Sequence, residues 1–167
     1  MNKPIELIVA VDTNYGIGLE GKIPWRCTDD MVHFKETTTT TQDPTKQNAV
    51  IMGRKTWESL KGKPLKNRIN ICLSKSPQLI PWSTTMEAAI KYANTNPIIE
   101  KIFIIGGERV YQEAVDNQDV ACIWITRIKR EFPTDRKVRF MKKYLSKFEN
   151  IAIVRETAEY CIWKYSQ

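Results

Sequence analysis

The chain of 167 residues has the length of one domain, so we expect a single domain over residues 1–167. Its 42% hydrophobic and 27% charged residues are ordinary for a globular protein. The formal net charge is +7, and nine cations lie between Arg127 and Lys147 against only Glu131 and Asp135. This basic segment favours anionic partners, although a solvated face is the simpler interpretation.

One histidine and four cysteines limit the chemistry that the chain can carry. No two cysteines form a Cys-x-x-Cys motif, so we expect reduced, buried thiols. A single histidine, His33, excludes histidine-rich metal sites and argues against a Ser-His-Asp triad, so we expect no metal. The N-terminus lacks the apolar core of a signal peptide, and no apolar run spans a bilayer. We therefore expect a cytoplasmic protein without a membrane partner.

The first predicted strand, 5–11, is followed by a turn and by a glycine motif. Gly16, Gly18 and Gly21 have the G-x-G-x-x-G spacing of a dinucleotide-binding turn. That motif requires a helix at its last glycine, and Pro24 would break a helix there. We therefore reject the Rossmann interpretation and predict a mobile loop that closes over a ligand.

A helix is predicted over 28–38, with Thr28 as its N-cap. Asp30 lies in the first turn, and Met31 and Phe34 fall on nearly the same face. A carboxylate beside these apolar side chains and beneath the first strand would be desolvated, which raises its pKa. Such an acid can bind an amidine-like N–C–N edge and support proton transfer. The alternative is an acid that only complements the helix dipole.

After a polar loop at 37–47, a strand at 49–52 ends in Gly53, followed by Arg54 and Lys55. Ligands of an open α/β sheet bind at the carboxyl ends of its strands, where backbone N–H groups attract phosphate. Two cations at such a place favour a polyphosphate or phospho-ribose group. Taken alone, the same three residues are typical of a solvated turn.

The rest of the chain alternates between strands and helices. Further strands are predicted at 69–73, 101–105 and 120–128, and helices at 56–60, 86–94 and 109–115, with Thr85 as a cap. The last two strands, 151–154 and 160–165, have no helix between them and are expected to pair antiparallel. This order predicts a mostly parallel sheet with an antiparallel edge.

Taken together, these short motifs resemble the dihydrofolate reductase family, in its eukaryotic or viral branch. The resemblance covers almost the whole chain, and each motif stands in the family's order. The motifs are Ile8–Val11, Gly16–Gly18, Ile23–Trp25, Asp30 with Phe34, Val50–Trp57, Pro64–Leu65 with Arg68, Leu73–Ser74, Ile105–Gly107 with Val110–Tyr111, and Ile125–Arg127. The resemblance implies a three-layer α/β/α fold with a central, mostly parallel eight-stranded sheet and an antiparallel C-terminal edge.

The resemblance implies an enzyme that reduces 7,8-dihydrofolate to tetrahydrofolate with NADPH and so supplies one-carbon metabolism. Hydride would pass to pterin C6, and Asp30 would bind the pterin and promote protonation of N5. Thr126 would support Asp30 through a water-linked network, and Trp25 would anchor the glycine loop beside the reacting groups. Arg68 would hold the glutamate carboxylate of the substrate. The full set of implied substrate-binding residues is Ile8, Val9, Asp30, Met31, Phe34, Lys35, Leu65, Arg68, Ile105, Tyr111 and Thr126.

The same resemblance implies an NADPH site, with cations that favour the extra 2′-phosphate and a cis peptide between Gly106 and Gly107. The implied cofactor-binding residues are Ala10, Gly16, Ile17, Gly18, Leu19, Glu20, Gly21, Lys22, Gly53, Arg54, Lys55, Thr56, Leu73, Ser74, Lys75, Gly106, Gly107, Glu108, Arg109, Val110 and Tyr111. Antifolate inhibitors are expected ligands, and a monomer is the expected state.

Two departures from the family pattern leave questions open. Glu108 stands where a small residue is usual, and its charge would weaken the cofactor unless it points away. Residues 136–140 differ from the usual pattern after Asp135, so its role in bracing the glycine loop is open. Two alternatives remain: a pyrimidine reductase of riboflavin synthesis, and a nucleic-acid-binding module that uses the basic segment. Neither is favoured, because neither requires Asp30 together with Arg68.

Overall fold

The computed structural model describes residues 2–75 and 83–167. Their centre is an eight-stranded sheet in the order β5-β4-β3-β6-β1-β7-β10-β9. From one edge to the other, the strands are Ser83–Thr84, Arg68–Leu73, Gln47–Gly53, Ile99–Ile104, Ile5–Val11, Cys122–Ile128, Tyr160–Ser166 and Asn150–Glu156. The strands from β5 to β7 are parallel, and β10 is antiparallel to both of its neighbours. The predicted sheet, with its antiparallel C-terminal edge, is confirmed.

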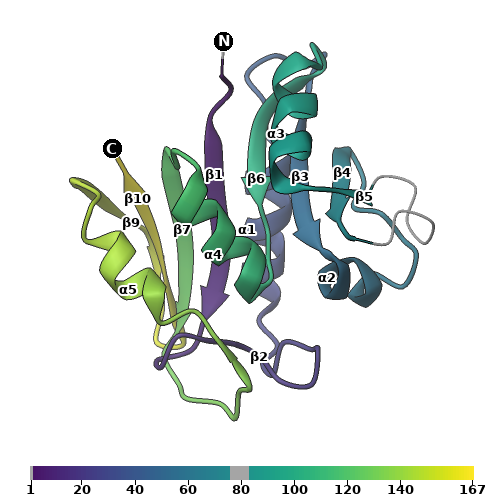
Figure 1. Ribbon diagram of the computed structural model, residues 1–167. Helices are drawn as coiled ribbons and strands as arrows, with labels where there is room; N and C mark the ends of the chain where they lie inside the picture. The colour runs from purple at the N-terminus through teal and green to yellow at the C-terminus, as the bar shows by residue number, and fades with distance from the viewer. Residues whose placement is uncertain (1, 76–82) are drawn as a thin grey trace.

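Helices cover both faces of this sheet and give the expected three layers (Figure 1). On one face lie α1 (Thr28–Thr39) and α2 (Arg54–Ser59). On the other lie α3 (Met86–Thr95), α4 (Glu108–Asn117) and α5 (Phe140–Leu145). Because side chains alternate along a strand, odd-numbered residues of β1 pack in the larger core under α3, α4 and α5. Ile8, an even-numbered residue, packs in the smaller core with Phe34 of α1.

The fold differs from the sequence prediction in several short elements. A second sheet pairs β2 (Gly16–Gly18) with β8 (Arg136–Lys137), so the glycine motif is a short strand rather than only a loop. The helix α5 within the basic segment was also not predicted. Helix α1 has Cys27 at its N-cap, and Thr28 is its first residue. Thr85 does cap α3, since its hydroxyl accepts from Ala88 N.

The parallel strands bring the predicted site segments to one edge of the sheet. Because β1, β3, β4, β6 and β7 run in the same direction, their carboxyl ends lie at a common edge, the lower one in Figure 1. The β2 segment and the connection before α5 lie just beyond it. Within residues 2–75 and 83–167, every helix is too short or too polar to cross a bilayer.

Candidate active site

Asp30 sits in the first turn of α1 and faces β7. The Thr126 hydroxyl donates a hydrogen bond to Asp30 Oδ1 at 2.6 Å. Burial raises the pKa of Asp30 above its ordinary value, while the Thr126 hydrogen bond and the charge of His33 act in the opposite direction. The expected desolvation of this acid is therefore present. The link between the two side chains is a direct hydrogen bond, whereas we had expected a water-mediated one.

Apolar side chains near Asp30 come from several elements. Ile8 is buried, and Phe34, Leu65 and Ile105 pack beside it in the smaller core. Leu65 is fixed because its backbone N donates to Asn70 Oδ1 at 3.0 Å, and Asn70 Nδ2 donates back to Leu65 O at 2.8 Å. These four residues form an apolar surface on the α1 side of the sheet.

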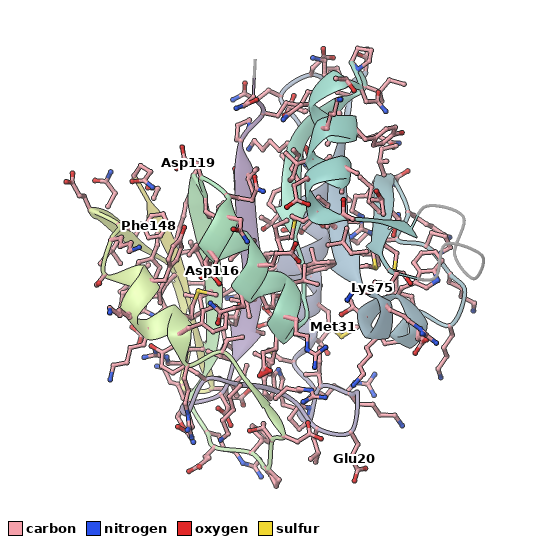
Figure 2. All side chains as sticks on the ribbon, in the orientation of Figure 1. Glu20, Met31, Lys75, Asp116, Asp119 and Phe148 are labelled. Carbon is pink, nitrogen blue, oxygen red and sulfur yellow. The ribbon has the colours of Figure 1, made fainter. Side chains whose placement is uncertain are left out.

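Three other predicted substrate residues are placed differently. Met31 is 63% exposed, and Figure 2 labels it beside the lower end of α4. Lys35 is exposed on α1. The Val9 side chain lies on the opposite face of the sheet from Asp30, in the larger core, because it is an odd-numbered residue of β1. Only the Val9 backbone can therefore face the site, and its place in the implied substrate-binding set stays a prediction.

Arg68 is the first residue of β4 and is only 9% exposed. Its Nε donates to Lys66 O at 2.8 Å, and one NH group donates to Thr38 Oγ1 at 3.1 Å. The guanidinium also lies over the Phe34 ring at 5.9 Å. No carboxylate in the described part of the chain forms an ion pair with it. Arg68 is thus a buried, fixed cation, with capacity left for an anionic group.

The turn after β6 meets the end of β3. Gly106 and Gly107 are joined by a cis peptide, as expected, and Gly53 N donates to Gly106 O at 2.8 Å. A Cβ on Gly53 would come within 3.0 Å of Val110 Cγ2. One on Gly107 would meet nothing nearer than Thr56 Oγ1 at 4.0 Å. The backbone at the start of α4 therefore faces open space beside the start of α2, as a close-fitting ligand requires.

Three cations lie on the segments that follow β3 and β4, and Figure 2 places one of them, Lys75, beside α2. Lys55, in α2, and Lys75, just after β4, are exposed. The Arg54 guanidinium donates from Nε to Glu58 Oε1 at 2.8 Å, in an exposed pair one turn apart on α2. Leu73 and Ser74 connect β4 to Lys75. The charge and backbone here fit a phosphate-bearing cofactor such as NADPH.

Tyr111 reaches from α4 to the middle of β1. Its hydroxyl donates to Ile8 O at 2.7 Å, and burial raises its pKa well above the ordinary value. The Tyr111 side chain is buried and packs in the larger core. It also lies close to Gly106, where an added Cβ would come within 3.3 Å of the hydroxyl. Tyr111 therefore holds the Gly106 turn in place beside β1.

The glycine loop is braced by two carboxylates. Leu19 and Lys22 exchange backbone hydrogen bonds across Glu20 and Gly21, which both have positive φ, so the tip is a tight turn. Asp135 Oδ2 accepts from Glu20 N at 3.0 Å, and Asp135 N donates to Gly18 O at 2.9 Å. The open question about Asp135 is answered, since it contacts the loop directly despite the changed residues that follow it.

The second carboxylate is Asp12, which is fully buried at the end of β1. Its Oδ1 accepts from Asn14 N and Gly16 N, and its Oδ2 accepts from Phe132 N. Trp25, at the other end of the loop, packs against the Phe132 ring with centroids 5.6 Å apart. Both ends of the loop thus converge on residues 132–137. Residues 12–16 are the turn expected after the first strand, and no sequence motif indicates that Asp12 holds it.

The Glu108 side chain points toward residues 132–137, the segment that contacts both ends of the glycine loop. Its Oε1 accepts from Lys137 N, in the strand β8 that pairs with Gly16, at 3.4 Å. Glu108, Arg109, Lys137, Arg139 and Phe140 line a groove of about 550 Å³ between α4 and the start of α5. The two departures from the family pattern therefore contact each other, and the Glu108 carboxylate is turned toward β8.

These features define an α/β protein with a half-buried, desolvated acid and a glycine-lined, cationic edge at the carboxyl ends of its parallel strands. Comparison with known proteins gives the family. The dihydrofolate reductase family model matches residues 4–161, and the chain belongs to the dihydrofolate reductase family. It is 34% identical to a dihydrofolate reductase of Candida albicans, with 98% of each chain covered.

Two further relatives differ in how much of their own length the chain covers. The chain is 40% identical to a dihydrofolate reductase of Drosophila melanogaster, over 77% of this chain and 75% of that one. It is 34% identical to a bifunctional dihydrofolate reductase-thymidylate synthase of Daucus carota, over 96% of this chain. The chain spans only 33% of that bifunctional relative's length.

Proposed function

We propose that this chain reduces 7,8-dihydrofolate to 5,6,7,8-tetrahydrofolate with NADPH, by hydride transfer to C6 and protonation at N5. The observation that carries the proposal is Asp30, a desolvated acid bonded to Thr126 at the carboxyl edge of the sheet. The activity named for its relatives agrees with this chemistry. The reaction would feed one-carbon metabolism.

Asp30 serves as the group that recognises the pterin and controls its proton. One of its oxygens is bonded to Thr126, which leaves the other for an N–H donor. A carboxylate with a raised pKa holds a proton more readily at neutral pH than an exposed one, so it can assist protonation of N5. Ile8, Phe34, Leu65 and Ile105 provide the apolar surface against which flat rings lie.

Arg68 binds the anionic end of the substrate. Its guanidinium is held by Lys66 O and Thr38 Oγ1, so it meets a carboxylate without losing further side-chain freedom. Met31 and Lys35 lie on the same helix as Asp30 and are proposed to border the substrate.

NADPH supplies the hydride when it is bound. The proposed holders of its phosphates are Arg54, Lys55, Thr56, Ser74 and Lys75, and the backbone of Gly106 and Gly107 allows its close approach. Ala10 lies beside Thr126 in the pairing of β1 with β7 and is proposed to flank the nicotinamide. Residues 16–22, fixed by Asp12 and Asp135, cover it and exclude water.

The remaining predictions from the sequence are proposals of the same kind. They are a single domain, a monomer, a cytoplasmic location and binding of antifolates, with nucleic-acid binding by the basic segment as the less favoured alternative. A steep salt dependence of RNA binding would support a nucleic-acid role for the basic segment.

The test is loss of absorbance at 340 nm with purified protein, NADPH and dihydrofolate, run beside Asp30→Asn. We expect turnover that falls about 10²–10⁴-fold in the variant, the range of a lost acid or base. Asp29→Asn is the matched control, because Asp29 is the neighbouring carboxylate but is held by Tyr160. Absence of turnover in folded wild-type protein would overturn the proposed reaction.

A further inference from the structure

His33, the chain's single histidine, lies one helical turn after Asp30 on α1. Its Nδ1 is 3.3 Å from Thr37 Oγ1. Its Nε2 is buried, and no atom of the described residues gives it a hydrogen-bond partner. A buried imidazole nitrogen normally has a partner, because leaving it unpaired carries a desolvation penalty. This second nitrogen therefore has unused hydrogen-bonding capacity one helical turn from Asp30.

The imidazole ring is fixed against β7. Its centroid is 5.9 Å from that of Trp124, at an angle of 56°. Trp124 and Thr126 are alternate residues of β7, so both point to the α1 face of the sheet. Asp30 contacts Thr126, and His33 contacts Trp124. Two titratable side chains of one helix thus face two adjacent side chains of one strand.

The charged groups around His33 come from three elements. On α1 these are Asp30 and Glu36, which both act to raise the pKa of His33. Glu6 of β1 accepts from Trp124 Nε1 at 2.7 Å, and Lys164 of β10 lies 4.7 Å from the Trp124 ring centroid. Both contact the same indole that the imidazole packs against. Burial outweighs the two acids, so the pKa of His33 is lowered overall.

We propose that His33 is a positioning residue that adds a second proton-binding group to the Asp30 site. The charge of Asp30 is then set by a carboxylate–imidazole pair. When His33 takes up a proton, its positive charge favours the ionised form of Asp30. The carboxylate consequently stays ionised to lower pH than it would alone. The consequence for turnover rests on the proposed function, but the pairing itself does not.

The primary experiment follows the imidazole by proton NMR during a pH titration of the substrate-free protein. One histidine gives one set of ring signals, so assignment is immediate. We expect Asp30→Asn to lower the titration midpoint of His33, because a neighbouring negative charge is removed. Glu36→Gln should lower it less. Asp29→Asn is the matched control and should leave it unchanged, since Asp29 is engaged by Tyr160 and Arg155.

The reciprocal experiment follows the Asp30 carboxyl carbon in His33→Phe, which keeps a ring against Trp124 but has no nitrogen. We expect the titration of Asp30 to move to higher pH, and the acid limb of kcat/KM for dihydrofolate to move with it. An unchanged His33 midpoint in Asp30→Asn, or an unchanged Asp30 titration in His33→Phe, would overturn the pairing. Neither NMR titration requires turnover, so a failed proposed function would be distinguished by the 340 nm assay.

Discussion

Asp30 is a residue whose charge is disfavoured by its own surroundings. Burial raises its pKa, so its folded state binds a proton more tightly than its unfolded state does. The free energy of unfolding therefore falls as pH rises from the ordinary pKa of an aspartate through the raised folded value. Such a carboxylate is kept for its chemistry and lowers the stability of the ligand-free protein.

The first prediction is that Asp30→Asn stabilises the protein at neutral pH. Asparagine keeps an oxygen for the Thr126 hydroxyl and removes the buried charge. Urea unfolding should show a gain over wild type at pH 7 that shrinks toward zero as pH falls below the ordinary aspartate pKa. A gain that does not depend on pH would show that charge is not the cause.

Arg68→Lys should weaken substrate binding with little change in kcat. A lysine cannot form a planar two-point contact with a carboxylate, and hydrogen bonds to charged groups contribute about 1.5–3 kcal/mol. This corresponds to a rise in KM of roughly 10–100-fold. Steady-state kinetics with dihydrofolate would measure it. A dihydropterin without the glutamate tail is the control substrate, and its KM should not change.

Among the elements, the β2–β8 sheet decides where the glycine loop lies. A Cβ on Gly16 would come within 2.5 Å of Thr134 Cγ2, whereas a Cβ on Gly18 would be 3.5 Å from its nearest neighbour, Lys22 O. The first distance is shorter than atoms tolerate, and the second is an ordinary contact. Gly16 is thus needed for the close approach of β2 to Thr134, which precedes β8, and Gly18 is not.

We expect Gly16→Ala to separate the loop from residues 134–137 and to weaken NADPH binding about tenfold or more, since loss of ~1.4 kcal/mol has that effect. Gly18→Ala is the matched control and should bind NADPH nearly as wild type does. Quenching of tryptophan fluorescence gives both dissociation constants. Equal loss in the two variants would contradict a specific role for the Gly16–Thr134 contact.

The same elements show what the sequence can and cannot predict. The strand 5–11 and the Thr85 cap follow from local patterns, and both are confirmed. The strands β2 and β8 have only three and two residues and pair over long sequence separations, so no local periodicity reveals them. The helix α5 lies in a segment so rich in cations that no helical pattern of apolar residues stands out. The direct Asp30–Thr126 contact depends on how α1 packs on β7, which local sequence does not determine.

At the scale of the whole molecule, burial separates the cysteines into two groups. Cys72, Cys122 and Cys161 are buried in strands, and Cys27 before α1 is only partly buried. Burial raises the pKa of Cys72 to about 11 and that of Cys122 to about 12. These strand thiols are therefore poor nucleophiles, as we expected from the sequence.

A thiol reagent should consequently modify Cys27 quickly in the native protein and the other three cysteines only after unfolding. Mass spectrometry after short exposure would identify the labelled peptide. Cys27→Ser should lose the fast phase, and the same reagent in denaturant should then label three sites. Rapid labelling of a strand cysteine in native protein would show that the sheet opens locally.

Side chains alternate along β7, so substitutions at its even-numbered and odd-numbered residues should have different effects. Trp124 and Thr126 face α1, whereas Ile123 and Ile125 belong to the larger core on the other face. The strand would be randomised, and variants would be selected for growth that depends on the protein and, separately, for the amount of protein in the cell. Substitutions at position 126 should leave the amount of protein nearly unchanged but abolish growth. Substitutions at positions 123 and 125 should reduce both. Successive residues of β7 would thus be constrained alternately by the activity and by the stability of the fold.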